Sequence, residues 1–324
     1  MINRRIFSSA AFSAVLPVSA QTVRPNGFPT RPIKLVVPFP AGGTTDALAR
    51  IVATRLSERV GQPVIVENKA GAGGLIGNDF VAKSPPDGYT LLLAITSLIQ
   101  APALYPSLPY EVPQSFAAIS QISAVSDFLV VGNRIKATSL GEYLKQVKEE
   151  PSKHNFGSYG NATSSHIHGE MLNQQAKTDL VHTPYKGAPA LITDIIGGQI
   201  EGGFVDVASL LPYLRAGKVK VLAVTGAERV KQAPDVPTFT ELGFKYFEPY
   251  GFFGVLAPAR TSGALIEFLG NNLSQIVAQA DVTAKLEGMG LKPVGSLPAA
   301  FESVIRTDLP VWSKVIKDAR ITVD

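Results

Sequence analysis

The amino-acid sequence predicts an α/β fold with two lobes. Short apolar runs typical of buried strands alternate along the chain with amphipathic segments that have a helical period. The composition, 45% hydrophobic and 17% charged over 324 residues, is that of a compact globular protein with two medium domains or one large one. The alternation predicts mostly parallel sheets covered by helices, with ligands bound at the carboxyl ends of the strands.

The order of these segments also predicts the domain organisation. Strand-like runs lie at residues 33–37, 64–66, 91–95, 128–131, 203–205 and 219–225, and helical segments lie at 47–60, 140–149, 165–175 and 188–197. The extended segments 126–131 and 247–255 are predicted to cross between the lobes as a hinge, which makes one lobe discontinuous. We expect one lobe at 29–127 plus 250–308, the other at 128–249, and a closing C-terminal helix at 309–324.

The N-terminus has the features of an export signal. Arg4 and Arg5 precede an apolar run at residues 6–18, and the segment ending at Ala20 has the small residues of a signal-peptidase site. We expect residues 1–20 to be removed and the mature protein to begin near Gln21, in a soluble compartment outside the cytoplasm. The paired arginines leave the choice between the general secretory and the twin-arginine route open. Without cysteine, the chain has neither a disulfide nor a lipid-modified thiol.

Charge argues against nucleic acid as a partner. The formal charge of +4 includes the arginines of the signal segment, and the lysines and arginines are dispersed. Binding to a phosphate backbone would require a basic stripe with interleaved aromatic residues. A modest positive field still helps to attract small anions.

The first strand leads into a loop that is suited to an anion. After residues 33–37, two adjacent glycines permit a close approach of the backbone, and a helical period follows. Backbone N–H groups and the positive end of the helix dipole at such a junction favour a carboxylate or phosphate. The loop residues are also good helix caps, so a helix start without a ligand is the alternative. The candidate ligand-binding residues here are Ala41, Gly42, Gly43, Thr44, Thr45 and Asp46.

A second polar, glycine-containing loop at residues 156–166 repeats this chemistry in the other predicted lobe. Its candidate ligand-binding residues are Ser158, Asn161, Ala162, Thr163 and Ser164. If the two loops face each other across a cleft, they can hold an acid with two acidic ends, or grip one carboxylate from both sides. The alternative is that Ser164 and Ser165 only cap the helix that follows.

Motifs of enzymes and cofactor sites are weak in this sequence. His166, His168 and Glu170 lack the spacing of a zinc protease, and surface or capping roles suit both histidines better. The segment 157–160 lacks the spacing of a nucleophile elbow. The glycines at 71–74 lack a correctly placed acidic partner for a dinucleotide and fit a structural turn. We therefore expect no catalytic residue, no metal and no cofactor.

Seven stretches in order resemble one family. They are IKLVVPFPAGGTTD at 33–46, VENKAGAGG at 66–74, PPDGYTL at 85–91, HTPYKG at 182–187, DIIGGQI at 194–200, LAVT at 222–225 and DVPT at 235–238. This set is similar to the substrate-binding receptors of tripartite tricarboxylate transporters, the Bug-type proteins, and it extends over nearly the whole mature chain.

The resemblance implies a monomeric periplasmic binding protein of the type II-like class. Such a protein closes two lobes around a small organic acid and delivers it to a membrane permease, without chemistry on the ligand. In the family, the loops matching 41–46 and 158–165 hold a ligand carboxylate, partly through bridging water. By the same resemblance, the cleft is lined by Thr96, Ser97, Tyr185, Lys186, Gly187, Ala188 and Asp206.

Three of these residues also have other possible roles. Asp206 can accept from an amino or hydroxyl group of the ligand, or brace a loop. Tyr185 offers a hydroxyl donor, and Lys186 offers a cation unless it is solvated at the rim.

One departure from the family concerns the far end of the ligand. Residues 94–100 are more apolar than the turn that usually follows this strand in the family. Apolar lining by Leu98, Ile99 and Phe252 favours an aromatic or longer aliphatic acid over citrate, whose hydroxyl it cannot satisfy. Leu98 and Ile99 can equally belong to a helix core. The alternative functions are a sensor of an organic acid and a secreted enzyme on the same scaffold.

Overall fold

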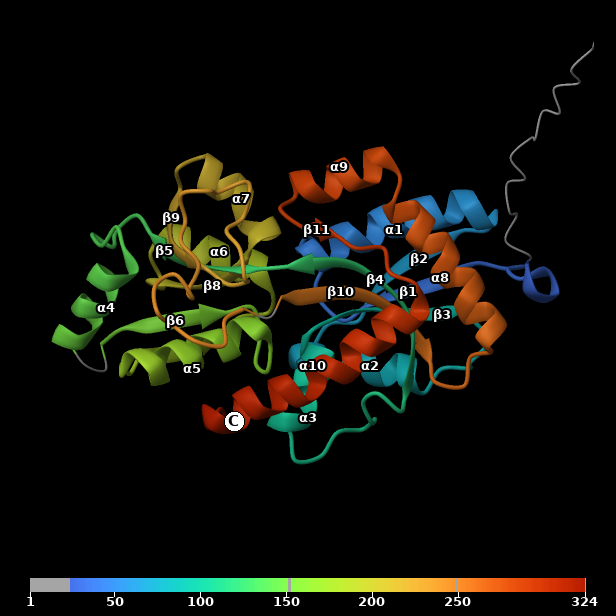
Figure 1. Cartoon of the computed structure of the whole chain (residues 1–324), viewed down its shortest axis with the longest axis horizontal. Helices are drawn as coiled ribbons and strands as arrows, with labels where there is room; N and C mark the ends of the chain where they lie inside the picture. Colours follow the sequence, from blue (N-terminus) through green and yellow to red (C-terminus); the bar gives the residue numbers. More distant parts are fainter. Residues whose placement is uncertain (1–23, 151–152, 249, 324) are drawn as a thin grey trace, which may run out of the picture.

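The computed structural model describes residues 24–150, 153–248 and 250–323, and in these residues the chain forms two lobes, each built on a mixed sheet. Figure 1 shows the two lobes side by side, joined by long strands. The predicted signal peptide at 1–20 lies outside the described residues. Among the described residues, no helix is both long and apolar enough to cross a membrane.

Lobe 1 is built on a six-stranded sheet with the order β11-β4-β10-β3-β1-β2. Its strands are β1 (Ile33–Val37), β2 (Val64–Asn68), β3 (Thr90–Ile95), β4 (Phe116–Val125), β10 (Gly251–Pro258) and β11 (Lys292–Pro293). The helices along this part of the chain are η1 (Pro25–Gly27), α1 (Thr44–Val60), η2 (Ala72–Gly74), α2 (Leu75–Ala82), α3 (Ser97–Leu104), α8 (Gly263–Val277), α9 (Ala280–Gly288) and α10 (Pro298–Asp318).

Lobe 2 is built on a five-stranded sheet with the order β7-β6-β8-β5-β9. Its strands are β5 (Asp127–Gly132), β6 (Asn155–Ser158), β7 (Val181–Pro184), β8 (Gly202–Asp206) and β9 (Val219–Val224). The helices are α4 (Leu140–Glu149), α5 (Ser164–Ala176), α6 (Ala188–Gly197) and α7 (Val207–Arg215).

The sheets are mixed, so the prediction of mostly parallel sheets is wrong. β1 pairs in parallel with β2 and β3, and β6 pairs in parallel with β7 and β8. Each antiparallel pairing involves β4, β5 or β10. These strands lie next to the crossings between the lobes, where the chain enters each sheet against the direction of the parallel strands.

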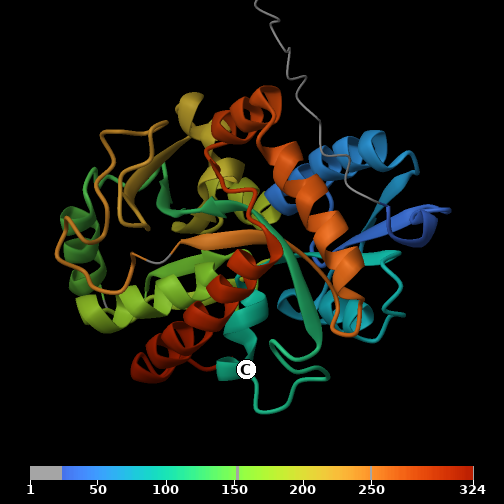
Figure 2. The ribbon, with the colours of Figure 1, turned by 45° about the vertical axis from the view of Figure 1, so that its right-hand side comes forward.

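The chain passes between the lobes twice. β4 ends at Val125 in one sheet and β5 begins at Asp127 in the other, and the chain returns between β9 and β10. The last helix, α10, begins at Pro298 and not at residue 309. It runs from lobe 1 alongside the crossing strands to the neighbourhood of α5 in lobe 2, as the red helix shows in both views (Figures 1 and 2).

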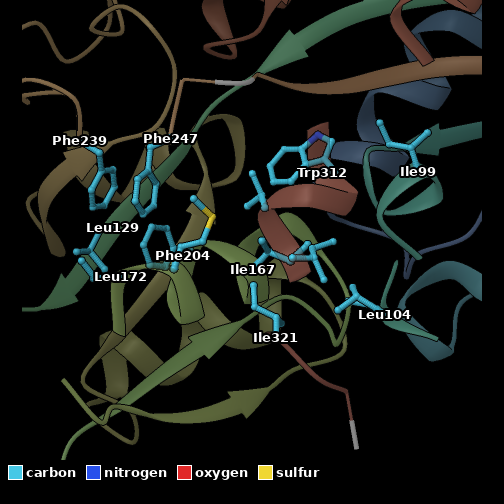
Figure 3. Packing of buried hydrophobic residues seen from close by; sticks show 14 of the residues in the cluster. Ile99, Leu104, Leu129, Ile167, Leu172, Phe204, Phe239, Phe247, Trp312 and Ile321 are labelled. Atoms are coloured by element: carbon cyan, nitrogen blue, oxygen red, sulfur yellow. The ribbon is translucent and has the colours of Figure 1, made fainter. Parts of the chain in front are cut away.

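A hydrophobic core continues from one lobe to the other beside this helix. Trp312 of α10 packs with Ile99 of α3 and Ile167 of α5, and the cluster extends to Phe204 and Phe247 in lobe 2 (Figure 3). The Phe239 and Phe247 rings stack at a centroid distance of 4.2 Å. The lobes are therefore joined by apolar packing as well as by the crossing strands.

A candidate ligand-binding cleft

A cavity lies between the lobes and takes its lining from both. It contains about 660 Å³ of space between atoms, including solvent at its open side. Its lining residues are Phe39, Pro40, Gly43, Thr44, Thr45, Ile95, Thr96, Val125, Asp127, Tyr159, Ser164, His168, Gly187, Ala188, Pro189, Asp206, Thr225, Gly251, Phe252 and Phe253. Three helices, α1, α5 and α6, begin at this cavity.

The start of α1 is shaped by the sequence between β1 and the helix. β1 is almost completely buried, and Gly42 with φ +89° makes the turn that brings the chain to the helix start. The N-cap residue Gly43 has no side chain to hydrogen-bond the first turn. The first N–H groups of α1 therefore remain available to an anion.

The Asp46 side chain stabilises this loop through hydrogen bonds. Its carboxylate accepts from the Gly42 backbone N–H at 3.1 Å, from Arg50 at 3.0 Å and from Asn68 at 3.1 Å. Burial acts to raise the pKa of Asp46, but these hydrogen bonds and the charge of Arg50 outweigh it and lower the pKa. Asp46 thus supports the loop and does not line the cavity.

Thr44 connects this loop to the opposite lobe. Its hydroxyl donates to Asp206 Oδ1 at 2.6 Å and lies 2.7 Å from the Ser209 hydroxyl. Asp206 is also the N-cap of α7, because its Oδ1 accepts from the Ser209 backbone N–H at 2.9 Å. Burial raises the pKa of Asp206, hydrogen bonds from Thr44 and Ser209 oppose that shift, and the charge of Asp127 adds to it. Asp206 therefore caps a helix and lines the cavity at the same time.

The second loop is held mainly by its own hydrogen bonds. Thr163 donates its hydroxyl to the Gly160 carbonyl at 2.6 Å, and the buried Ser158 hydroxyl lies 2.7 Å from His182 Nε2. Ser164 reaches the other lobe, since its hydroxyl accepts from Gln100 Nε2 at 3.0 Å. The N-cap side chain of α5, Thr163, makes no hydrogen bond to the helix. The first turn of α5 is therefore open to an acceptor, as in α1.

An aspartate and a histidine form a buried pair in the cavity wall. Asp127 Oδ2 lies 3.0 Å from His168 Nδ1, and both side chains are almost completely buried. The Tyr159 hydroxyl approaches the same carboxylate at 3.3 Å and 3.4 Å. Burial raises the pKa of Tyr159 well above its usual value, and the charges of Asp127 and Asp206 add to the shift. Tyr159 is therefore a neutral hydroxyl donor at neutral pH.

Aromatic and aliphatic side chains make up most of the remaining wall. Phe39, Ile95, Phe252 and Phe253 line the cavity. Leu98 and Ile99 do not, because both are buried in the core that surrounds α3. The expectation of an apolar wall thus applies to Phe252, and of the two alternatives for Leu98 and Ile99 the structure has the helix core and not the cavity lining.

The structure brings eight of the predicted site residues to the cavity. These are Gly43, Thr44, Thr45, Thr96, Ser164, Gly187, Ala188 and Asp206. Thr96 also accepts from the Phe252 backbone N–H at 2.8 Å, so it fixes β10 against α3.

The other predicted residues lie around the cavity without lining it. This set comprises Ala41, Gly42, Asp46, Ser97, Ser158, Asn161, Ala162, Thr163, Tyr185 and Lys186. Ala41, Gly42 and Lys186 are exposed. Ser97 donates to the Gly73 carbonyl at 3.3 Å, and Tyr185 donates to Asp194 at 2.9 Å. The Ala162 backbone N–H donates to His166 Nδ1 at 3.3 Å.

Both histidines considered as metal ligands are buried, so of the surface and capping roles expected for them the surface role is wrong. His166 receives the hydrogen bond from the second loop, and its ring stacks on that of His182 at 3.9 Å between centroids. Burial lowers the pKa of His166 to about 4. Within the described residues, no three acidic, histidine or cysteine side chains are grouped to hold a metal ion.

Sequence reasoning missed Asp127, Tyr159, His168 and Thr225. Asp127 stands in the first crossing segment and Tyr159 in the second loop, so both segments were recognised without these roles. Thr225 accepts from the Asp127 backbone N–H at 2.9 Å through its hydroxyl. The available signal was a polar residue next to an apolar strand. Asp127 reaches the carboxyl edge of the sheet because β5 begins beside the end of β8, to which it is antiparallel.

Comparison with known proteins agrees with this geometry. Residues 48–321 match the model of the tripartite tricarboxylate transporter family receptor. The periplasmic binding protein BugD is 32% identical with a TM-score of 0.87, covering 91% of this chain and 100% of that one. A protein of R. palustris, Rpa4515 with adipate, is 30% identical with a TM-score of 0.87, covering 91% and 100%.

A third solved structure, MatC from Rhodopseudomonas palustris with bound malate, is 28% identical. Its TM-score is 0.84, and the match covers 89% of this chain and 100% of that chain. The family match extends over most of the sequence, and the two-lobe fold is shared with the three solved structures. This chain therefore belongs to the family of tripartite tricarboxylate transporter receptors, the Bug-type solute-binding proteins.

Proposed function

We propose that this protein captures a small organic acid in the periplasm by closing its two lobes, and delivers the acid to the membrane permease of a tripartite tricarboxylate-type transporter. The observation that carries the proposal is the cavity at which α1, α5 and α6 begin. The N-cap residues of these three helices make no side-chain hydrogen bond to the first turn, so the first-turn N–H groups of α1 and α5 are available to a ligand carboxylate, and those of α6 except at Pro189, which has none. Solved relatives with adipate and malate support an acid as the ligand.

The wall of the cavity supports an acid with an apolar frame. Phe39, Ile95, Phe252 and Phe253 offer no hydrogen bond from their side chains to a ligand hydroxyl. An aromatic acid or a longer aliphatic acid is therefore favoured over citrate, whose buried hydroxyl would lose its partners from water.

Closure provides the signal that the permease reads. Thr44 and Ser164 each make hydrogen bonds to the opposite lobe, so both helix starts contact the same ligand only when the lobes are together. A ligand that binds this arrangement more tightly than a separated one shifts the population towards it.

A thermal-shift screen tests the proposal. The mature protein, from Gln21 onward, is heated with mono-, di- and tricarboxylates and with aromatic acids. A ligand at about 100 times its Kd adds about 2.7 kcal/mol to the free energy of unfolding, which raises Tm by about 4 °C for a chain of this size, whose unfolding entropy is about 0.6 kcal/mol/K. Absence of a shift with every acid, in folded protein freed of carried-over ligand, would refute the acid-binding function. Tighter binding of citrate than of an aromatic diacid would refute the apolar frame.

The transport step has its own test. Deletion of the gene should abolish uptake of the identified radiolabelled acid, and the wild-type gene should restore it. Normal uptake in the deletion strain would contradict the assignment to a transporter.

A further inference from the structure

Two aspartates stand directly opposite each other in the cavity wall. Asp127 opens β5 and Asp206 ends β8, and the two residues are register partners in the antiparallel pair. Both line the cavity, and their exposed fractions are only 4% and 8%. Like charges at directly opposed positions of an antiparallel pair destabilise a sheet, and burial increases that cost.

Hydrogen bonds reduce this cost without cancelling the charge. The Asp127 carboxylate is hydrogen-bonded to His168 Nδ1 and, at a longer distance, to the Tyr159 hydroxyl. The Asp206 carboxylate accepts hydrogen bonds from the Thr44 hydroxyl and the Ser209 backbone N–H. Tyrosine, threonine and backbone donors are neutral. They stabilise a carboxylate but leave its negative charge in the cavity.

His168 Nδ1 lies 3.0 Å from the Asp127 carboxylate. Its Nε2 is buried and has no hydrogen-bond partner. Among the described residues that line the cavity there is no lysine or arginine. The wall therefore carries negative charge opposite helix starts that attract negative charge.

We propose that the Asp127–Asp206 pair receives a protonated amine of the ligand, so that the transported compound is an organic acid that also carries an ammonium group. Its carboxylate lies at the starts of α1 and α5, and its amine lies between the two aspartates. This inference rests on the proposed function, since it assigns the substrate class of the same cavity. A metal ion is a poorer occupant, because the described residues offer no group of three ligands.

The two ends of such a ligand match opposite sides of the cavity. The N–H groups at a helix start favour an anion, and a pair of carboxylates favours a cation with several N–H donors. A plain diacid would place its second carboxylate near Asp127 or Asp206 and be repelled unless one aspartate took up a proton. The presence of the amine thus determines which acid binds.

Matched ligands test the proposal without any mutation. Succinate and aspartate, glutarate and glutamate, and adipate and 2-aminoadipate differ only by one amine. 6-Aminohexanoate carries an ammonium group at the end where adipate carries its second carboxylate. Isothermal titration at pH 7 should show at least one amine-bearing acid binding about tenfold or more tightly than its plain partner, as expected for a hydrogen-bonded charge pair.

Two substitutions then locate the effect. Asp127→Asn retains an acceptor for His168 and Asp206→Asn retains the helix cap, and each should weaken the amine-bearing ligand by about tenfold or more. Asp127→Asn should not weaken a plain diacid, because it removes a repelling charge. Asp206→Asn also weakens the Thr44 bond between the lobes, so it should lower the affinity for the amine-bearing acid more than that for its plain partner. Asp235→Asn is the matched control, since this aspartate is exposed and lies outside the cavity lining. Circular dichroism and thermal unfolding establish that each variant is folded.

The outcomes separate this inference from the proposed function. Plain diacids that bind as tightly as their amine-bearing partners in every pair would overturn the amine subsite and leave the acid receptor intact. The amine subsite is overturned in the same way if both aspartate variants keep the affinity of the wild type for the amine-bearing acid. Failure of every acid in this set, and of every acid in the thermal-shift screen, to bind folded wild-type protein would overturn both.

Discussion

Gly73 offers a direct test of lobe closure, because it touches the opposite lobe through a position that tolerates no side chain. A Cβ built on Gly73 would lie 2.4 Å from the backbone carbonyl oxygen of Asn161 in lobe 2. A backbone oxygen cannot rotate away as the tip of a side chain can. In the Gly73→Ala variant the lobes must separate here by about 1 Å to restore ordinary van der Waals contact.

The expected loss of affinity follows from the interlobe hydrogen bonds. A retreat of this size would stretch the Thr44–Asp206 bond from 2.6 Å and the Gln100–Ser164 bond from 3.0 Å beyond hydrogen-bonding range. The first bond has a carboxylate acceptor and the second is between neutral groups, so their loss costs about 2–4 kcal/mol together. Binding of the acid ligand should weaken by about 30-fold to 1,000-fold.

Backbone strain must be separated from this effect. Gly73 has φ +61°, and alanine in that region costs about 1–2 kcal/mol whether the lobes are together or apart. Gly217 has φ +64°, and no atom lies within 4 Å of the position that a Cβ would take there, so Gly217→Ala carries the same strain without the clash. Both variants should lose similar unfolding free energy, and only Gly73→Ala should lose affinity.

Titration calorimetry measures the affinity, and small-angle scattering reports whether ligand reduces the radius of gyration. If Gly73→Ala binds within about twofold of the wild type and contracts normally, the reasoning that this contact limits closure is wrong. Equal losses of affinity in both glycine variants would instead assign the effect to backbone strain.

Three further predictions concern stability and the cleft. Burial lowers the pKa of His166 to about 4, and burial with the charge of His166 lowers that of His182 to about 3. The unfolded chain therefore binds protons below pH 6.5 that the folded protein does not bind. The free energy of unfolding should fall by about 1.4 kcal/mol per pH unit for each histidine as the pH is lowered from 6.5 towards 4. Urea unfolding at a series of pH values should show that this free energy falls less steeply with pH in His182→Gln than in the wild type. Thr44→Val removes a donor to a buried carboxylate across the cleft and should weaken ligand binding by about 10-fold to 150-fold in calorimetry, because such a bond contributes about 1.5–3 kcal/mol; unchanged affinity would exclude a role in closure. Phe247→Ala removes a fully buried stacked ring and should cost about 3–5 kcal/mol in urea unfolding, and a loss under about 1 kcal/mol would contradict the packing argument.

Much of the fold could be predicted because local pattern and tertiary burial agree in many segments. The predicted helices at 140–149 and 188–197 coincide with α4 and α6. β4 was not predicted, since Ser120 and Ser123 are fully buried and interrupt its apolar pattern. The beginning of α10 was misplaced because Pro310 stands inside the helix, where proline normally ends or kinks one.

The cleft was less predictable than the fold. The two glycine-containing loops were recognisable because a strand, a turn and a helix follow one another within a short segment. The pairing of Asp127 with His168 joins residues 41 positions apart, and it depends on how α5 packs on the sheet of lobe 2. The opposition of Asp127 and Asp206 depends on strand register, which no local pattern in the sequence specifies.

The position of β10 has a consequence for the order in which the protein can be assembled during synthesis. β10 lies between β3 and β4 in the sheet of lobe 1, yet it follows the whole of lobe 2 in the chain. A nascent chain that has reached residue 248 holds all five strands of lobe 2, while the sheet of lobe 1 still lacks its internal strand. The chain therefore supplies every strand of the later lobe before it completes the sheet of the earlier one, and the cleft between them can exist only after both sheets are complete.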